Sequence, residues 1–416
     1  MGKRRIRSVA ILGGGPAGAS LATYLARAGL EVTLFSAGKR PPIIVGESLV
    51  PAIVPFLREL GIEEEVRSYS VYKGGATFVL GRDEAMSFRF YEVRGAATTY
   101  SYNVPRDKFD ESILDAARRA GAHVVAHGAR VERVGDSDRV RLSDETLAAA
   151  SDVLSSQPDF IVDAGGRRRV LPRLMGVEAV EGERKDTALH AHIEGVEVEI
   201  PGNVHTDRLE HGWCWRIPLP GRVSLGFVVD TEYIMKFGNS PEEQFDNYIR
   251  HDPVISPWAA PATRVTPVVK YTNYQLCSAR GVGANWALVG DTFGFVDPVF
   301  SSGVLIALQS AELLSRAILS GSDRAFQRYE REVSRIITAW QQVIGLFYNG
   351  RLLTMFKVGQ FVRKTRLGRV MDFHFSKYMP RIFTGEAATS RYSLGLVRFM
   401  ANYGLIGNDP RELEIR

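Results

Sequence analysis

The sequence is short of cysteine, of long apolar runs and of net charge. Only two of its 416 residues are cysteines, Cys214 and Cys277, too few for a disulfide framework or a cysteine-based zinc site. No stretch reaches the roughly 18 uninterrupted apolar residues of a membrane span. The apolar run after the basic amino terminus, Val9 to Leu12, is too short for a secretory signal. We therefore expect a cytoplasmic protein.

The charges nearly balance, with 52 Lys and Arg against 47 Asp and Glu and a formal net charge of +5. This small positive excess does not by itself indicate a nucleic-acid partner. Glycine, in contrast, is abundant: forty residues exceed the usual share of about 7%, which suits a fold with many tight strand-to-helix turns. The chain is too long for one ordinary core, so we expect two or three packed subdomains.

The segment "VAILGGGPAGASLATYLARAGLEVTLF" has the pattern of a strand, a glycine turn, a helix and a second strand. Gly13, Gly15 and Gly18 form G-x-G-x-x-G, in which the glycines permit the tight turn, the approach of a pyrophosphate and close helix packing, respectively. The pyrophosphate would lie at the helix N-terminus, where free N–H groups and the helix dipole meet it. A lone glycine turn can serve other purposes, but the complete context predicts dinucleotide binding.

One residue expected in this motif is missing. The acidic residue that usually binds the ribose hydroxyls, about 20 positions on, is replaced by Ser36. A serine hydroxyl binds another hydroxyl less strongly than a carboxylate does, so we expect weaker affinity for the adenosine end. The sequence also shows no second glycine fingerprint for a nicotinamide cofactor.

Two later stretches place Asp and Gly directly after an apolar strand. They are "DFIVDAGGR" at residues 159–167 and "WALVGDTFGFVDPVFSSGV" at residues 286–304. Asp291 is positioned to bind ribityl hydroxyls, and the helix start at Ser302 and Gly303 offers free N–H groups to a flavin or an anion. Two ordinary strand-to-helix turns are the alternative, which the order of the three segments disfavours.

With "NVPRDKFDESILDAARRAG" at residues 103–121, these segments resemble FAD-dependent enzymes of the aromatic hydroxylase fold. The resemblance covers all but the C-terminal part of the chain. It implies an FAD cofactor, with Arg106 near the flavin and Asp291 on the ribityl chain. Further cofactor contacts implied by the resemblance are Pro16, Ala17, Glu47, Pro298, Gly303 and Val304.

The stretch "GWCWRIPLPG" uses two of the chain's five tryptophans. Trp213 and Trp215 are two positions apart on a predicted strand, so their side chains share one face while Cys214 and Arg216 point to the other. Each ring is large and has only two torsions, which suits an aromatic wall inside a site. Ordinary core packing is the alternative.

The motif "WCWRIP" matches the W-x-W-x-I-P motif of flavin-dependent halogenases, and two further segments are similar to that family. Lys73, in "VYKGGATF", stands where the essential lysine of the family lies, and a desolvated lysine loses its proton readily. In "DPVFSSGV" the amides of Ser302 and Gly303 stand where the family binds halide. A surface position for Lys73, and a contact to flavin alone for Ser302 and Gly303, are the alternatives.

The resemblance implies a reaction in which reduced FAD, dioxygen and chloride or bromide give hypohalous acid. A separate flavin reductase would supply the reduced FAD. The wall of Trp213 and Trp215 would separate flavin from substrate, and Lys73 would direct the halogen. Whether Lys73 hydrogen-bonds the hypohalous acid or is itself halogenated stays open.

A second missing residue bears on the substrate. In tryptophan-type halogenases a glutamate three positions before the glycine of the last motif assists loss of the ring proton, and here that position is Phe300. Phenol-type and pyrrole-type members lack this glutamate, since an electron-rich ring reacts without it. We therefore expect a phenol or pyrrole of antibiotic or other natural-product biosynthesis, either free or tethered to an acyl or peptidyl carrier protein.

The tail is aromatic and basic, with one acidic residue, Asp372, among residues 351–381. A basic surface would steer an acidic carrier protein, a solvated helix face beside an aromatic lid fits equally well, and membrane-surface binding is the least favoured interpretation. The basic residues are Arg351, Lys357, Arg363, Lys364, Arg366, Arg369, Lys377 and Arg381.

The predicted fold is α/β, with a Rossmann-like FAD domain, an inserted antiparallel β-sheet substrate domain and a helical C-terminal region. We expect no metal site. The first alternative to a halogenase is an FAD-dependent aromatic monooxygenase or reductase of the same fold, and the second is a catalytically idle flavoprotein that binds a partner through its basic tail. The predicted domains are residues 1–80, 100–185 and 280–320 for FAD, 81–99 and 186–279 for the substrate, and 321–416 for the tail.

Overall fold

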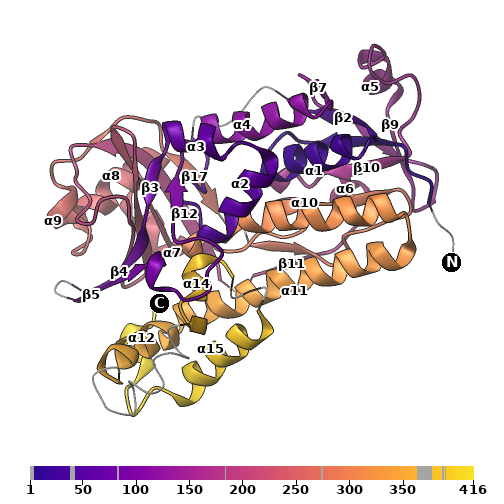
Figure 1. The fold of residues 1–416 in the computed structure, drawn as a ribbon. Coiled ribbons are helices and arrows are strands. Elements are labelled where there is room, and N and C mark those ends of the chain that lie inside the picture. The colour runs from indigo at the N-terminus through magenta and orange to yellow at the C-terminus, as the bar shows by residue number, and fades with distance from the viewer. Residues whose placement is uncertain are drawn as a thin grey trace.

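The computed structural model describes residues 4–37, 43–81, 84–182, 184–272, 275–362, 377–386, 388 and 390–416. Two large sheets organise these residues, one parallel and one mixed, and helices pack around both (Figure 1). This is the α/β architecture that the sequence predicts.

The parallel sheet has five strands in the order β19-β10-β1-β2-β7. Its central strand, β1, has the sequence SVAIL with all but the first residue buried, as expected for a strand covered on both faces. Helices α1 (Pro16–Arg27), α4 (Arg106–Arg119) and α10 (Ser302–Ser320) pack beside the sheet. Its strands are β1 (Ser8–Leu12), β2 (Glu31–Phe35), β7 (His123–Val125), β10 (Phe160–Asp163) and β19 (Trp286–Leu288).

The mixed sheet has the order β16-β12-β15-β14-β13-β4-β5, with β17 also paired to β12. Its pairs are antiparallel except β13 with β4, which run parallel, so the sheet is not wholly antiparallel as predicted. The predicted boundary at residues 80 and 81 lies inside β4, since this strand already pairs with β13 from Ala76. The strands are β4 (Gly75–Gly81), β5 (Glu84–Arg89), β12 (Asp186–Glu194), β13 (Val204–Arg208), β14 (Gly212–Leu219), β15 (Arg222–Asp230), β16 (Thr263–Arg264) and β17 (Val269–Thr272).

The mixed sheet has two different faces. On β14, Trp213 and Trp215 belong to the large apolar cluster that includes the parallel sheet and its helices. Cys214, between them, belongs to a second cluster that includes residues of α8 (Pro241–His251) and α9 (Ser256–Ala259). The alternation expected for this strand is therefore observed.

The described part of residues 321–416 is mostly helical. Helix α11 packs along α10, and α12 packs against α11 and α15 (Figure 1). The elements are α11 (Asp323–Tyr348), α12 (Arg351–Val362), α14 (Arg381–Thr384), α15 (Arg391–Tyr403) and a 3-10 turn, Pro410–Leu413.

Short ribbons and helices complete the described chain. The ribbons pair β3 (Val71–Lys73) with β6 (Ser101–Asn103), β8 (Val131–Arg133) with β9 (Val140–Leu142), and β11 (Ala179–Glu181) with β18 (Leu276–Ser278). The short helices are α2 (Val54–Leu60), α3 (Glu63–Tyr69), α5 (Asp144–Ala149), α6 (Val170–Leu174) and α7 (Thr231–Ile234).

Helix α10 is the one described helix that is long and apolar enough to cross a membrane. Its most apolar window is 67% buried inside the protein, and the helix packs against both α1 and α11. Burial among these neighbours accounts for its composition, because a core helix is apolar on most of its faces.

A buried ion pair in the mixed sheet allows a prediction about the stability of the fold. Arg216 Nη2 lies 2.7 Å from Asp207 Oδ1, and the two side chains are 3% and 0% exposed. Asp207→Asn leaves the Arg216 charge buried without a counter-charge, so we expect a loss of about 3–5 kcal/mol in the free energy of unfolding, measured by urea denaturation.

The control is Glu145→Gln, which breaks the exposed pair with Arg130. Exposed pairs contribute about 0–1 kcal/mol, so this variant should unfold almost like the wild type. Equal losses in Asp207→Asn and Glu145→Gln would contradict the prediction.

Candidate active site

The glycine turn between β1 and α1 leaves an open surface in front of the helix. Gly13 has a φ of +116°, and an added Cβ would collide with the Ala164 carbonyl. A Cβ on Gly18 would collide with the carbonyl of Gly13. Around Gly15, in contrast, no described atom lies within 4 Å of an added Cβ. Two of the glycines are thus required by packing, while Gly15 leaves room for a ligand at the N-terminus of α1.

The predicted adenosine-end and pyrophosphate residues lie close to this turn. Pro16 is the first residue of α1. A Cβ added to Gly14 would come within 2.6 Å of the Ser36 hydroxyl oxygen, so Ser36 lies directly beside the turn. Ala17 is near the start of the 3-10 turn that contains Asp291, because a Cβ on Gly290 would come within 2.8 Å of the Ala17 Cβ. The contacts of these residues with FAD remain predictions.

Asp291 lies in the 3-10 turn Gly290–Thr292. Burial raises the pKa of its carboxyl to about 6, while the charges of Arg106 and Arg167 act in the opposite direction. No hydrogen bond or ion pair to this carboxyl is found among the described residues. A desolvated carboxyl without a protein partner fits the hydroxyl groups of a ribityl chain.

Arg106 is held at the start of α4, facing the loop that contains Glu47. Its Nε donates to Asp110 Oδ1 at 2.9 Å, and its Nη1 donates to the Val45 carbonyl. A Cβ on Gly46 would come within 2.7 Å of Arg106 Nη1 and 3.6 Å of Val304 Cγ2. The structure therefore brings Gly46, Arg106 and Val304, from three distant parts of the sequence, into one place.

The two tryptophans form a buried pair with fixed indole N–H groups. The ring centroids of Trp213 and Trp215 are 5.5 Å apart. Trp213 Nε1 donates to Tyr348 Oη at 2.9 Å, and Tyr348 Oη donates to Asp297 Oδ2 at 2.8 Å. Trp215 Nε1 donates to Ser224 Oγ at 3.3 Å. The pair is therefore held in orientation as well as buried, as a wall requires.

Lys73 is buried, in contrast to the usual surface lysine. Its side chain is 2% exposed, and its Nζ donates to Ser48 Oγ at 2.7 Å and to the Leu49 carbonyl at 2.8 Å. The structure shows no ion pair to Lys73 within the described ranges. Burial lowers the pKa of the amine to about 7. Near neutral pH much of the amine is therefore unprotonated and nucleophilic.

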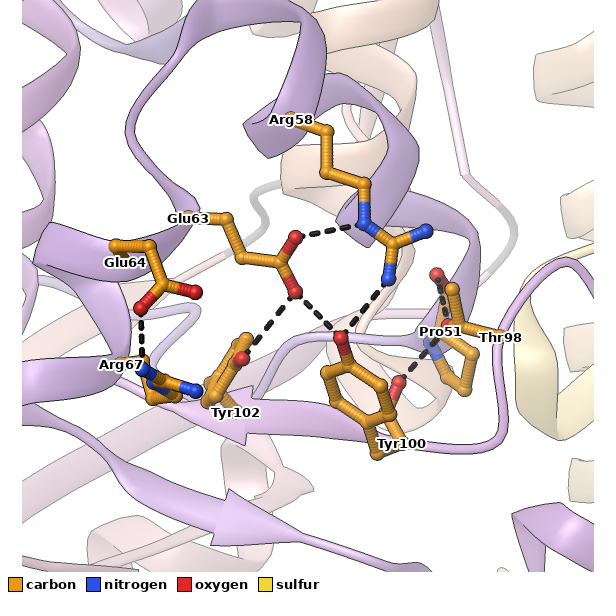
Figure 2. A network of polar contacts seen from close by, with 8 residues as sticks. All are labelled: Pro51, Arg58, Glu63, Glu64, Arg67, Thr98, Tyr100 and Tyr102. Carbon is orange, nitrogen blue, oxygen red and sulfur yellow. Dashed lines mark hydrogen bonds and ion pairs between the residues drawn. The ribbon is translucent and has the colours of Figure 1, made fainter.

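A hydrogen-bond network on the protein surface holds the ribbon that carries Lys73 (Figure 2). The Glu63 carboxylate accepts from Tyr100 Oη at 2.5 Å and from Tyr102 Oη at 3.3 Å, and Arg58 Nε donates to it at 2.7 Å. Burial raises the pKa of Glu63, but these hydrogen bonds outweigh it and lower the pKa overall. Since Tyr102 lies in β6, which pairs with β3, the network anchors Lys73 to α2 and α3.

The start of α10 has the features of an anion site. Its N-cap residue, Ser301, has a left-handed φ of 55° and makes no side-chain capping bond to the described chain. The Ser302 hydroxyl oxygen is buried and has no hydrogen-bond partner among the described residues. At Gly303 an added Cβ would meet no described atom within 4 Å. Free N–H groups, an unpartnered hydroxyl and open space suit halide or flavin oxygen.

Phe300 packs in an aromatic cluster just before this helix. It belongs, with Pro298, to the 3-10 turn Pro298–Phe300. Its ring centroid lies 5.8 Å from that of Phe347 and 6.2 Å from that of Trp340, and the side chain is 5% exposed. Apolar packing thus replaces the carboxylate that tryptophan-type enzymes have here.

The basic tail lies only partly within the described residues, because Arg363, Lys364, Arg366, Arg369 and Asp372 fall outside them. Of the others, Arg351 donates to the Ala401 carbonyl, Lys357 pairs with Glu84, and Arg381 donates to the Gly95 carbonyl. These three cations have partners within the chain, and carrier binding by the tail stays a prediction.

The sequence analysis missed the partners that fix the predicted residues. Tyr348 and Asp297 hold Trp213. Glu47 Oε1 lies 2.7 Å from His192 Nε2, and its contact with the cofactor stays a prediction. The H-x-H spacing of His190 and His192 on an apolar strand places both imidazoles on one face. It was a signal in the sequence for polar groups buried in this strand, although it does not identify Glu47 as the partner of His192.

Comparisons with known proteins identify the family of the chain. A family model described as tryptophan halogenase matches residues 8–96 and 79–356. A tryptophan 2-halogenase of Chondromyces crocatus is 28% identical over 381 residues, which cover 86% of this chain and 72% of that protein. A 1H-pyrrole-2-carbonyl-[peptidyl-carrier protein] chlorinase of Pseudomonas fluorescens is 28% identical over 389 residues, covering 83% of this chain and 84% of the relative.

Solved structures show the same fold. The myxobacterial chondrochloren halogenase CndH, described as an FAD-dependent halogenase, superposes with a TM-score of 0.72 at 27% identity, covering 98% of this chain and 99% of its own. A flavoprotein/dehydrogenase from Cytophaga hutchinsonii superposes with a TM-score of 0.78 at 23% identity, covering 96% of this chain and 99% of its own. The second likeness shows the fold alone.

The depressed pKa of Lys73 predicts a pH-dependent stability. The amine has a pKa of about 7 in the folded protein, against 10.5 for an ordinary lysine. Between these values the unfolded chain binds more protons, so the Lys73 contribution to stability rises with pH from about 7 to about 10.5. Methionine has no titratable group. The free energy of unfolding of the wild type should therefore rise relative to that of Lys73→Met from about pH 7 to about pH 10.5, as measured in denaturant titrations.

Lys236→Met is the matched control, because Lys236 is exposed on the far side of the mixed sheet. It removes a lysine from the surface and so serves as the reference for the change in charge. A difference for Lys73→Met that stays constant from pH 7 to pH 10 would show that Lys73 is not desolvated.

Proposed function

Since this chain belongs to the tryptophan halogenase family and is an FAD-dependent halogenase, we propose that it halogenates an electron-rich phenol or pyrrole through hypohalous acid directed by Lys73. A separate flavin reductase supplies the reduced FAD in this proposal. The observation that carries it is the Lys73 amine, which is buried and held by Ser48 and the Leu49 carbonyl, and whose pKa burial lowers to about 7.

The residues present fit FAD. The open surface at Gly15 would suit the pyrophosphate, the Asp291 carboxyl the ribityl hydroxyls, and the unpartnered Ser302 hydroxyl a polar atom of the flavin. When bound, reduced FAD supplies with dioxygen the two-electron oxidation that brings halide to the level of hypohalous acid.

The protein's own groups then control where that oxidant goes. Amides at Ser302 and Gly303 hold the halide. Trp213 and Trp215 exclude the aromatic substrate and bulk water from the cofactor side, since both rings are buried and hydrogen-bonded. The Lys73 amine holds the hypohalous acid by a hydrogen bond or accepts the halogen on nitrogen, and both forms deliver it to the ring.

The aromatic cluster around Phe300 supports an activated ring as substrate. Halogenation of an aromatic ring ends with loss of a ring proton, and no carboxylate stands at Phe300 to accept it. A phenol or a pyrrole stabilises the cationic intermediate through its own oxygen or nitrogen lone pair, so proton loss does not require that group. The benzo-ring carbons of tryptophan are less activated, and halogenation there is the reaction that we expect this site to catalyse least.

The proposal includes both a free substrate and a substrate that is tethered to a carrier protein. Tethering is supported by the pyrrole chlorinase relative, whose substrate is held on a peptidyl carrier protein. The basic residues of the tail would attract an acidic carrier.

The test combines the purified protein with a flavin reductase, FAD, NADH, dioxygen and chloride or bromide. The substrate panel contains phenols, pyrrole-2-carboxyl compounds and tryptophan, each free, and the first two also on carrier proteins. We expect halide-dependent halogenated phenol or pyrrole by mass spectrometry, at least tenfold less product from tryptophan, and no product with Lys73→Ala.

Lys236→Ala controls for the removal of a lysine elsewhere and should retain full activity. Two outcomes would overturn the proposal. Lys73→Ala with wild-type product would remove Lys73 from the reaction, and NADPH oxidation that is stimulated by substrate but independent of halide would assign the protein to the monooxygenases.

A further inference from the structure

Tyr348 is the last residue of α11, and its side chain is buried between two parts of the candidate site. The hydroxyl oxygen accepts a hydrogen bond from Trp213 Nε1 at 2.9 Å and donates one to Asp297 Oδ2 at 2.8 Å. Burial and then the negative charge of Asp297 raise the pKa of the hydroxyl well above its ordinary value. The proton therefore stays on the oxygen, and its donor and acceptor roles are both fixed.

Asp297 connects this hydroxyl to the start of α10. Its Oδ1 accepts from the Val299 N–H at 3.0 Å, so the carboxylate caps the 3-10 turn Pro298–Phe300. Ser301 follows that turn and is the N-cap residue of α10. One oxygen of the carboxylate thus holds the turn, and the other holds Tyr348. The amides of the predicted halide site come directly after Ser301, so their position depends on this turn.

The ring and the backbone of Tyr348 are held in place as well as its hydroxyl. The guanidinium carbon of Arg184 lies 4.1 Å from the ring centroid, within the range of a cation–π contact. Arg184 is itself fixed by two hydrogen bonds to the Asp186 carboxylate, at 2.9 and 3.0 Å. The Tyr348 carbonyl accepts from the Ile415 N–H at 2.9 Å. Because its ring and backbone are both held, the hydroxyl sets the positions of its two partners.

The hydroxyl joins three parts of the chain that are far apart in the sequence. Trp213 belongs to β14 of the mixed sheet, Asp297 precedes α10 beside the parallel sheet, and Tyr348 ends a helix of the C-terminal region. A close-packed interior transmits a displacement from one group to the next. A movement of the turn at Asp297 is therefore passed to the indole of Trp213, and the reverse also holds.

We propose that Tyr348 is a positioning residue that sets the tryptophan wall and the halide site relative to one another. Through Asp297 it fixes the turn before the halide-binding amides, and through Trp213 it fixes one ring of the wall that separates the oxidant from bulk water. This role needs no contact with halide, cofactor or substrate. The inference rests on the proposed function, which includes the wall and the halide site, and it adds the C-terminal region to the parts that control the reaction.

The first measurement is bromide binding to the protein loaded with oxidised FAD, followed by quenching of the flavin fluorescence. Tyr348→Phe removes only the hydroxyl and frees the turn at Asp297. We expect the dissociation constant for bromide to rise about fivefold, the factor that corresponds to one hydrogen bond, while the affinity for FAD is unchanged. A loss of folded protein would lower the amplitude of the titration but leave the dissociation constant as it is.

The second measurement is leakage of oxidant through the wall. The protein is given reduced FAD, dioxygen and saturating bromide without an aromatic substrate, and monochlorodimedone traps the free hypobromous acid. The trapped share should rise in Tyr348→Phe because the Trp213 indole loses its acceptor. In a Trp213→Phe background, which already lacks the donor, Tyr348→Phe should still weaken bromide binding but add nothing to the leakage.

Tyr329→Phe is the matched control. Tyr329 lies on the same helix, is 1% exposed, and donates its hydroxyl proton to the Leu288 carbonyl. The substitution therefore removes a buried, hydrogen-bonded hydroxyl and leaves the bonds of Tyr348 in place. Bromide affinity and leakage should both stay at the wild-type values. Should Tyr348→Phe not fold, Asp297→Asn weakens the same hydrogen bond by removing the charge of its acceptor, and it should also weaken bromide binding.

The proposal holds if Tyr348→Phe weakens bromide binding and increases leakage while Tyr329→Phe does neither. It is overturned if Tyr348→Phe leaves either quantity at the wild-type value, or if the two variants change both quantities equally. A wild type that does not bind bromide would overturn the halide site of the proposed function and this inference with it. Bromide binding without any halogenated phenol or pyrrole would contradict the proposed substrate class alone.

Discussion

The two-sided mixed sheet is the constraint on which the candidate site depends. Strand side chains alternate between faces, so each residue on β14 and β12 belongs to one face only. The face with Trp213, Trp215, His190 and His192 packs toward the cofactor-binding part, and the face with Cys214 and Arg216 packs on α8 and α9 or pairs with Asp207. A shift of one residue in the register would exchange these faces and place an ion pair where the aromatic wall stands.

The polar groups buried in the dry interior fall into two kinds. Arg216 Nη2 and Asp207 Oδ1 pair with one another within the mixed sheet. The Ser302 hydroxyl has no partner in the described chain, and a buried polar group without a partner costs free energy. Such groups persist where a ligand completes them.

Two residues that the family pattern leads one to expect are missing, and the structure gives each absence a different meaning. Ser36 still lies beside the glycine turn, with its hydroxyl against Gly14, so a polar group remains at the adenosine end. Phe300 packs among aromatic rings, so no polar group replaces the glutamate. The relatives at 28% identity include both a tryptophan and a pyrrole halogenase, and overall similarity therefore does not choose a substrate. The local chemistry at Phe300 favours the activated ring.

The sequence by itself determined the features that depend on neighbouring residues: the glycine turn, the buried strands of the parallel sheet, the shared face of Trp213 and Trp215, and the helix that begins at Ser302. It did not determine that β4 joins the mixed sheet beside β13, because a parallel pair between distant segments leaves no local pattern. Nor did it predict that Lys73 would be buried against Ser48, that Tyr348 would hold Trp213, or that Glu47 would pair with His192. Periodicity reports which way a side chain points, whereas its partner is set by long-range packing, and only the tertiary structure decides that.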